Sequence, residues 1–195
     1  MKQQIVLASN NQGKIKEFNE LFNQLDIEII PQSEFNIPET DEPFNTFIEN
    51  SLQKARHCAK LTGLPSLADD SGLCVKALNG APGVHSAYYA GLPKNIAANN
   101  ALLIKNLQGS EQRDAYFYCC LVLVKHVDDP QPIISDGWVA GTIIDIPHGD
   151  NGFGYDPYFY LPQYNKTFAE LDTSIKNSIS HRAMALQSLL AKLKG

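Results

Sequence analysis

Stretches typical of β-strands alternate along this chain with stretches in which apolar residues recur at helical spacing. Ile5 to Ser9 is predicted to form a short buried strand, and after a polar turn the helical spacing begins near Lys14. Two longer extended runs, 116–127 and 138–146, come later in the chain. Because strands and helices interleave without strict βαβ regularity, we predict an α/β fold with a mixed sheet.

The remaining elements follow from the same patterns. Thr46 and Glu49 have the spacing of a capping box, which predicts a helix through about Ala59 whose buried stripe includes Phe47 and Ile48. Further strands are predicted at 27–30, 67–68, 73–75 and 158–161, a helix at 95–107, loops at 80–91 and 149–157, and a last helix that begins near 176.

Composition narrows the class of protein. The chain has 195 residues, 44% of them hydrophobic, and no repeat or flexible linker divides it, so we expect one domain spanning residues 1–195. Sixteen basic against 21 acidic residues give a net charge of −5, which argues against a nucleic-acid partner. The longest apolar stretch, 115–124, covers half of the roughly 20 residues that a membrane helix needs. We therefore expect no membrane partner.

The cysteines and the N-terminus indicate a compartment. Cys58, Cys74, Cys119 and Cys120 contain no C-x-x-C spacing, and we interpret them as buried free thiols in a reducing cytosol. The N-terminal apolar run is too short for the hydrophobic region of a signal peptide. The expected location is the cytoplasm.

The first segment whose residues could bind a ligand joins the first predicted strand to the first predicted helix. It reads Ser9, Asn10, Asn11, Gln12, Gly13 and Lys14. Free N–H groups at a helix start and a nearby cation suit a phosphate chain, although the glycine spacing of a Walker A loop is missing. A capped helix with a surface lysine is the alternative.

The second segment is acidic. Asp69 and Asp70 follow a predicted strand directly and precede Ser71 and Gly72, while an acidic loop at 39–42 lies upstream. One carboxylate of an adjacent pair can reach Mg²⁺ while its neighbour organises the turn. A turn without any chemistry is the alternative.

Two further segments offer contacts for a ligand. In the run 152–157, two glycines around Phe153 allow close backbone approach and provide a stacking face, unless the aromatic ring is tucked into the core. In the run 176–182, Lys176, His181 and Arg182 supply donors for phosphate or a carbonyl, unless this is simply a solvated helix start.

Six motifs occur in one order along the chain. They are Ser9-Asn10-Asn11-Gln12-Gly13-Lys14, the segment 42–51, Ala68-Asp69-Asp70-Ser71-Gly72-Leu73, Gly80-Ala81-Pro82-Gly83, Phe153-Gly154-Tyr155-Asp156-Pro157 and Ser180-His181-Arg182. In this order and spacing, from Ile5 to Leu193, the chain closely resembles the inosine triphosphate pyrophosphatase family, whose bacterial members are dITP/XTP pyrophosphatases.

The resemblance implies an elongated mixed sheet flanked by helices, with two lobes and a nucleotide cleft between them. It implies a Mg²⁺-dependent homodimer that hydrolyses the non-canonical purine nucleotides ITP, dITP and XTP to the monophosphate and pyrophosphate. Asp70 is then the catalytic position and a metal ligand together with Glu42, for which Glu39 and Asp41 are alternatives. The expected substrate-binding residues are Ser9, Asn10, Asn11, Gln12, Gly13, Lys14, Ser71, Phe153, Gly154, Tyr155, Asp156, Lys176, His181 and Arg182.

The chain departs from the family pattern at several positions. Asn10 stands where glycine is common, and Tyr88 takes the place of an arginine, which removes a cation. Phe44 and Asn45 replace a glycine-containing pair.

For the mechanism, we expect water to attack the α-phosphorus and expel pyrophosphate, with Asp70 as base or as metal ligand. A carboxylate at its ordinary pKa of about 4 is a weak base, so the metal would supply most of the activation. Two other hypotheses remain: a pyrophosphatase for modified pyrimidine nucleotides, and a nucleotide-binding regulator without catalysis.

Overall fold

The computed structural model describes residues 2–22, 26–38 and 40–194. Its contacts divide the chain into two compact units. The first unit comprises Met1–Asp70, Cys120–Asp136 and Ala185–Gly195, and the second comprises Ser71–Cys119 and Gly137–Met184. The nucleotide cleft between two lobes stays a prediction.

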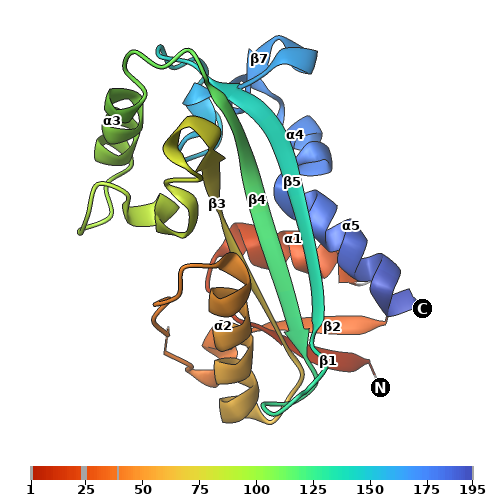
Figure 1. Ribbon diagram of the computed structural model, residues 1–195. Helices are drawn as coiled ribbons and strands as arrows, with labels where there is room; N and C mark the ends of the chain where they lie inside the picture. The colour runs from red at the N-terminus through yellow and green to blue at the C-terminus, as the bar shows by residue number, and fades with distance from the viewer. Residues whose placement is uncertain (1, 23–25, 39, 195) are drawn as a thin grey trace. The chain divides into compact units, whose positions relative to one another are not determined.

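Within the described residues, seven strands form one sheet in the order β2-β1-β3-β4-β5-β6-β7 (Figure 1). β1 pairs in parallel with β2 and β3, whereas β6 pairs antiparallel with β5 and β7, so the predicted mixed sheet is confirmed. The bounds are β1 Gln3–Leu7, β2 Ile27–Pro31, β3 Ser66–Val75, β4 Asp114–Val124, β5 Ile133–Ile143, β6 Phe159–Leu161 and β7 Lys166–Thr167.

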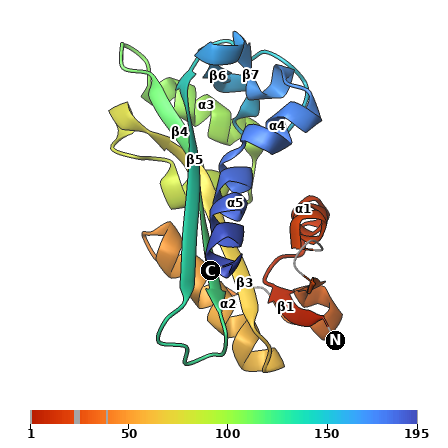
Figure 2. The same ribbon diagram turned by 90° about the vertical axis from the view of Figure 1, so that its right-hand side faces the viewer.

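The α-helices flank this sheet, as Figures 1 and 2 show from two sides. None of the helices in the described part of the chain is long and apolar enough to cross a membrane. Their bounds are α1 Gln12–Phe22, α2 Phe47–Thr62, α3 Ile96–Asn106, α4 Thr173–Ile179 and α5 His181–Lys194.

In the first unit, apolar side chains from helices cover the short parallel strands. Phe18 and Phe22 of α1 are fully buried and stack on each other, with ring centroids 6.2 Å apart. Cys58 of α2 packs against Val6 of β1. The Ser135 hydroxyl donates to the Ala185 carbonyl and ties α5 to β5.

Helix α2 begins as predicted, and two alanines of its predicted buried stripe, Ala55 and Ala59, are buried. Thr46 is its N-cap and accepts the Glu49 N–H, and the helix extends to Thr62. Ile48 is 40% exposed, so its assignment to the buried stripe is wrong. Asn50 and Ser51 are buried instead, because polar partners on other elements satisfy their side chains.

The second unit has an aromatic core. Phe117, Phe159 and Phe168 lie with their ring centroids 4.7–5.7 Å apart. Gly72 allows β3 to approach the 3-10 helix Gly83–Tyr88 closely, since a Cβ on Gly72 would lie 2.2 Å from the Gly83 carbonyl oxygen. This close packing explains why a glycine occupies position 72 within a strand, without any turn there.

Several predicted boundaries are wrong. The segment 69–72 is not a strand end, because β3 continues unbroken from Ser66 to Val75. The last helix does not begin near Lys176: Lys176 lies in α4, Ser180 is extended, and α5 starts at His181. β5 spans 133–143 rather than 138–146. The four cysteines are free and buried, as predicted.

Candidate active site

Asp69 and Asp70 lie in the middle of β3, and this position decides how they can act. Successive side chains of a strand point to opposite faces, so the two carboxylates have different partners. Asp69 is 2% exposed, and both of its oxygens accept hydrogen bonds from the Lys14 ammonium, at 2.8 and 3.0 Å. Asp70 is 6% exposed and accepts a hydrogen bond from the Asn50 amide at 3.1 Å.

The turn between β1 and α1 positions Lys14. Asn11 precedes the helix, and its side-chain oxygen accepts the backbone N–H of Lys14 at 3.2 Å, as an N-cap does. The Ser9 hydroxyl accepts the N–H of Asn11. The structure therefore combines the two alternatives for this segment: a capped helix, and a lysine directed at a buried carboxylate. Asn10 and Gly13 are exposed, and the side chain of Gln12 lies outside the described part.

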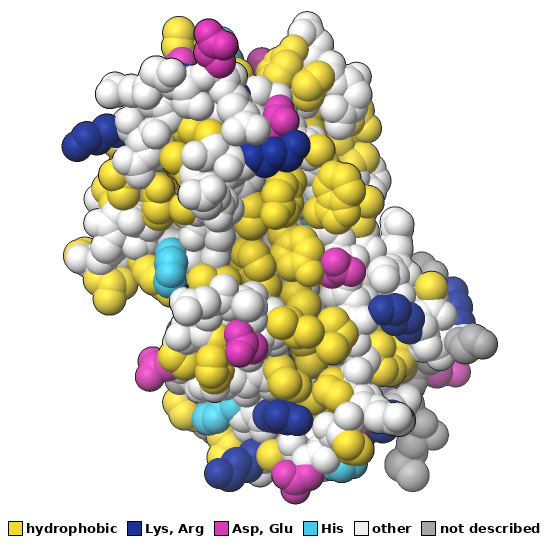
Figure 3. Space-filling model, viewed as in Figure 1, with side chains coloured by type: hydrophobic (Ala, Val, Ile, Leu, Met, Phe, Trp, Pro, Cys, Tyr) yellow, Lys and Arg dark blue, Asp and Glu magenta, His cyan; other side chains and the backbone are white. Residues whose placement is uncertain are grey.

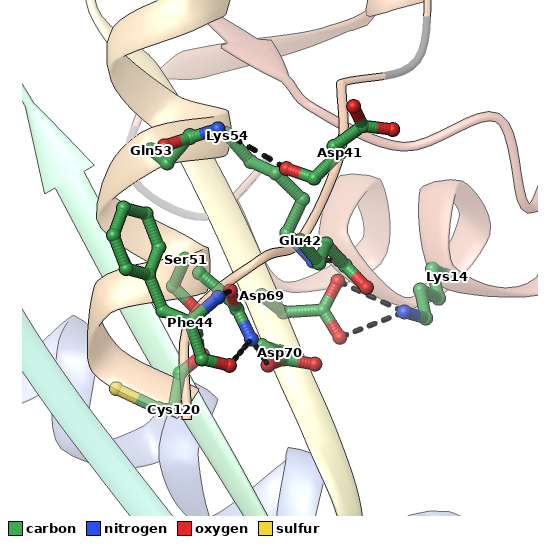
Figure 4. Close-up of polar contacts among 11 residues, drawn as sticks. Lys14, Asp41, Glu42, Phe44, Ser51, Gln53, Lys54, Asp69, Asp70 and Cys120 are labelled. Carbon is green, nitrogen blue, oxygen red and sulfur yellow. Dashed lines mark hydrogen bonds and ion pairs between the residues drawn. The ribbon is translucent and has the colours of Figure 1, made fainter. Parts of the chain in front are cut away.

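A second lysine, which the sequence analysis missed, lies among the carboxylates. Lys54 of α2 forms an ion pair with Glu42 (Figure 4). Asn50 and Lys54 are four residues apart, so they lie on the same face of the helix. On that face, the buried Asn50 amide contacts Asp70. That helical spacing of two polar side chains in an otherwise apolar helix face was the available signal.

Electrostatics link these groups. Burial opposes the charged form of Lys54, but attraction to Asp69, Asp70 and Glu42 outweighs it and raises the pKa of Lys54. Burial, with repulsion from Glu42 and Asp69, raises the pKa of Asp70 to about 6, although Lys54 and Asn50 oppose the shift. Three carboxylates thus lie with two ammonium groups, and at Asp70 the effect of burial outweighs the attraction of Lys54.

In the acidic loop, Glu42 lies near Asp70, and its role as a metal ligand stays a prediction. Asp41 is exposed, and its backbone carbonyl accepts a hydrogen bond from Gln53 at 3.1 Å (Figure 4). Glu39 lies outside the described residues. Among the described residues, no three His, Cys, Asp or Glu side chains form a group able to hold a metal ion by themselves.

The second unit holds a separate group of predicted site residues. Asp156 is 4% exposed, and one of its oxygens accepts both the Lys176 ammonium at 2.6 Å and the Phe153 N–H at 2.7 Å. The Phe153 ring is 68% exposed and lies 5.5 Å from the Lys176 ammonium nitrogen. Gly152 makes room for the pair: a Cβ there would lie 2.2 Å from that Asp156 oxygen and 2.7 Å from the ammonium. An exposed flat ring beside a fixed cation suits a planar ligand.

The other predicted residues of this unit take supporting positions. The Tyr155 hydroxyl donates a hydrogen bond to the Ser86 carbonyl at 2.9 Å. The His181 ring stacks on Phe117 with centroids 5.1 Å apart, and Arg182 is half-buried in the first turn of α5. Ser71 follows Asp70 in β3 and is half-buried.

The raised pKa of Asp70 leads to a prediction about stability without divalent cations. Folding raises this pKa from 3.8 to about 6, so the ionised carboxylate destabilises the folded state above pH 6 and the effect vanishes below pH 4. Asp70→Asn removes the charge and retains an oxygen for Asn50. We expect it to raise the free energy of unfolding by about 2–3 kcal/mol at pH 8. Urea unfolding at pH 8, 6 and 4 measures this difference. An equal difference at all three pH values would contradict the assignment.

Comparison with known proteins places this geometry in a family. Residues 5–192 match the Ham1 family. The dITP/XTP pyrophosphatase of Chromobacterium violaceum is 58% identical over 194 residues, which cover 100% of this chain and 98% of that protein. The dITP/XTP pyrophosphatase of Neisseria meningitidis serogroup B is also 58% identical, with 98% and 96% covered.

Solved structures agree. A HAM1 protein from Coxiella burnetii has a TM-score of 0.96 and 47% identity, with 98% of both chains covered. A nucleoside-triphosphatase, or dITP/XTP pyrophosphatase, from Mycobacterium abscessus has a TM-score of 0.81 and 39% identity, covering 98% of this chain and all of that one. These matches confirm the resemblance inferred from the motifs: the chain belongs to the Ham1 family.

Proposed function

We propose that the protein hydrolyses the non-canonical purine nucleoside triphosphates ITP, dITP and XTP to the monophosphate and pyrophosphate. The observation that carries the proposal is the cluster in the first unit, where Lys14 and Lys54 lie among the carboxylates of Asp69, Asp70 and Glu42. The relatives from Chromobacterium violaceum and Neisseria meningitidis are named dITP/XTP pyrophosphatases, which supports release of pyrophosphate from two of these substrates.

The two lysines are suited to a triphosphate because each is held in advance by a carboxylate. Lys14 is fixed by both oxygens of Asp69, and Lys54 by Glu42. A cation that is already positioned loses less side-chain entropy when phosphate binds. With the backbone of the turn 9–14, these ammonium groups bind the phosphates and stabilise the charge of the pyrophosphate leaving group.

Asp70 is better suited as a base than the sequence analysis expected. A pKa of about 6 leaves the carboxylate ionised at pH 7, yet makes it more basic than an ordinary aspartate of pKa about 4. We assign to Asp70 the orientation of the attacking water and removal of its proton. The Asn50 amide holds the carboxylate in place during this step.

The residues fit Mg²⁺. Mg²⁺ sites usually combine one or two carboxylates with substrate phosphates and water. Here three carboxylates and two ammonium groups give the cluster a net charge of −1 when all are ionised. Glu42 would hold the ion, and Asp70 would be its second ligand in the alternative to its role as base. When bound, it supplies positive charge at the phosphates and lowers the pKa of water. Neutralisation of the excess charge also fits the raised pKa of Asp70.

The second unit is assigned to the base. The Lys176 ammonium, held by the buried Asp156 carboxylate, presents a donor next to the exposed Phe153 ring. A 6-oxopurine offers the complementary acceptor, whereas adenine presents an amino donor at the same position. This pattern favours purines such as hypoxanthine and xanthine over adenine.

The direct test is an assay of purified protein with ITP, dITP, XTP, ATP and modified pyrimidine triphosphates, with and without Mg²⁺. We expect pyrophosphate, rather than inorganic phosphate, from the 6-oxopurine nucleotides with Mg²⁺. Preference for the pyrimidines would favour the alternative pyrophosphatase, and binding without turnover would favour the regulator.

Charge removal in the carboxylate pair should separate the two roles. Asp70→Asn should lower kcat about 10²–10⁴-fold because the base is lost. Asp69→Asn loosens Lys14 and should cost about 10–100-fold. Asp128→Asn, at an exposed position of the same unit, is the matched control and should be neutral. A larger loss in Asp69→Asn than in Asp70→Asn would reverse the assignment.

Base choice should depend on Lys176. In the wild type, a site built around hydrogen bonds to the base can discriminate by about 10⁴–10⁵ in kcat/KM. Lys176→Met should reduce kcat/KM for ITP about 100-fold and change that for ATP much less, so the preference shrinks. Lys166→Met, an exposed lysine in the same unit, serves as control. An unchanged ratio of ITP to ATP would show that Lys176 does not read the base.

We further propose a cytoplasmic homodimer. The four buried free cysteines fit a reducing compartment. Figure 3 shows hydrophobic side chains gathered on one face of the molecule. Trp138 of β5 is 55% exposed and contacts Tyr116 of β4 edge to face, which offers a dimer face. Light scattering should give about twice the chain mass of 21.5 kDa, and Trp138→Glu should favour the monomer. The control is Leu61→Glu, on exposed α2 surface. A monodisperse wild-type monomer at micromolar concentration would refute the dimer.

A further inference from the structure

Two consecutive buried amides of α3 hold two loops of the second unit. Asn99 is 4% exposed, accepts the Ala90 N–H at 2.7 Å and donates to the Ala87 carbonyl at 3.1 Å. Asn100 is 8% exposed and donates to the Gly154 carbonyl at 3.0 Å. Asn99 thus binds the end of the 3-10 helix and the segment after it, and Asn100 binds the loop that carries Phe153.

The two amides differ in how completely they are satisfied. Asn99 uses both its donor and its acceptor. The buried Oδ1 of Asn100 has no hydrogen-bond partner among the described residues. An unpaired buried acceptor lowers stability, so this asparagine is not explained by stability alone. The hydrogen bond of this side chain is the one that its amide nitrogen donates to the Gly154 carbonyl.

Gly154 joins two anchored residues through a backbone conformation that favours glycine. Its φ is +65°, in the left-handed region. Glycine has more conformational freedom than other residues, so a hydrogen bond to its peptide group is an effective restraint. The next residue, Tyr155, is anchored through its hydroxyl to the Ser86 carbonyl, and the preceding Phe153 through its N–H to Asp156. The Asn100 amide therefore supplies the restraint between these two anchors.

We propose that Asn100 is a positioning residue for base recognition: by holding the Gly154 carbonyl it fixes the direction of the exposed Phe153 ring. The inference rests on the proposed role of Phe153, Asp156 and Lys176 in binding the base. Asn100 need not touch the substrate to act in this way. Its effect falls on affinity for the base and not on the cleavage step, which belongs to the carboxylates of the first unit.

The test compares Asn100→Ala and Asn100→Asp with Asn106→Ala. Asn106 lies on the same helix, and its amide donates to the Tyr89 hydroxyl at 2.8 Å. A misplaced binding group commonly costs about 10–100-fold. We expect Asn100→Ala to raise KM for ITP at least about 10-fold with kcat within about threefold. Asn100→Asp should be more severe, because a carboxylate oxygen would face the Gly154 carbonyl. The control should match the wild type.

Calorimetry with two probes separates positioning from general damage. IMP carries the base, whereas inorganic pyrophosphate reports only on the phosphate-binding residues. Asn100→Ala should weaken IMP binding about 10-fold and leave pyrophosphate binding unchanged. Equal weakening of both, or unchanged IMP affinity, would overturn the inference while a wild type that releases pyrophosphate from ITP upholds the proposed function. A wild type that binds IMP but releases no pyrophosphate would contradict the function, and the IMP arm would still decide the role of Asn100.

Discussion

The carboxylates of Asp69 and Asp70 are buried at consecutive positions of β3, and neighbouring elements supply a partner to each. Burial of charge is expensive unless partners compensate for it. Lys14, at the start of α1, pairs with Asp69, while Asn50 of α2 donates to Asp70. Compensation is incomplete at Asp70, whose pKa is raised to about 6. The first unit therefore carries unbalanced negative charge at the position where the proposed chemistry needs a base and a cation.

The second unit repeats the same physical device. The buried carboxylate of Asp156 holds the Lys176 ammonium, as Asp69 holds that of Lys14. In both cases the side-chain oxygens are nearly inaccessible while part of the lysine stays exposed, so the cation is presented from a fixed point. The backbone of Gly152 lies so close to Asp156 and Lys176 that any side chain at position 152 would overlap both of them. Rigid cations of this kind favour a defined ligand geometry over mere attraction of phosphate.

The sequence was sufficient for the fold class and for most of the residues assembled in each unit, and it failed where polar groups are buried. Asp, Ser and Gly at 69–72 have the composition of a turn, yet they continue a strand, because partners distant in the chain satisfy the carboxylates. Helical periodicity counts apolar residues, so Lys54 was missed on a face where charge is buried. Contacts such as that of Asn100 with Gly154 join residues 54 positions apart and leave no local pattern.

In the mechanism that we propose, the carboxylates and lysines of the first unit direct water to the α-phosphorus. Hydrolysis of ITP in water enriched in oxygen-18, followed by mass spectrometry of both products, tests it most directly. Attack at the α-phosphorus places the label in IMP and leaves pyrophosphate unlabelled. Label in pyrophosphate alone would mean attack at the β-phosphorus, and it would contradict the roles assigned to Asp70, Lys14 and Lys54.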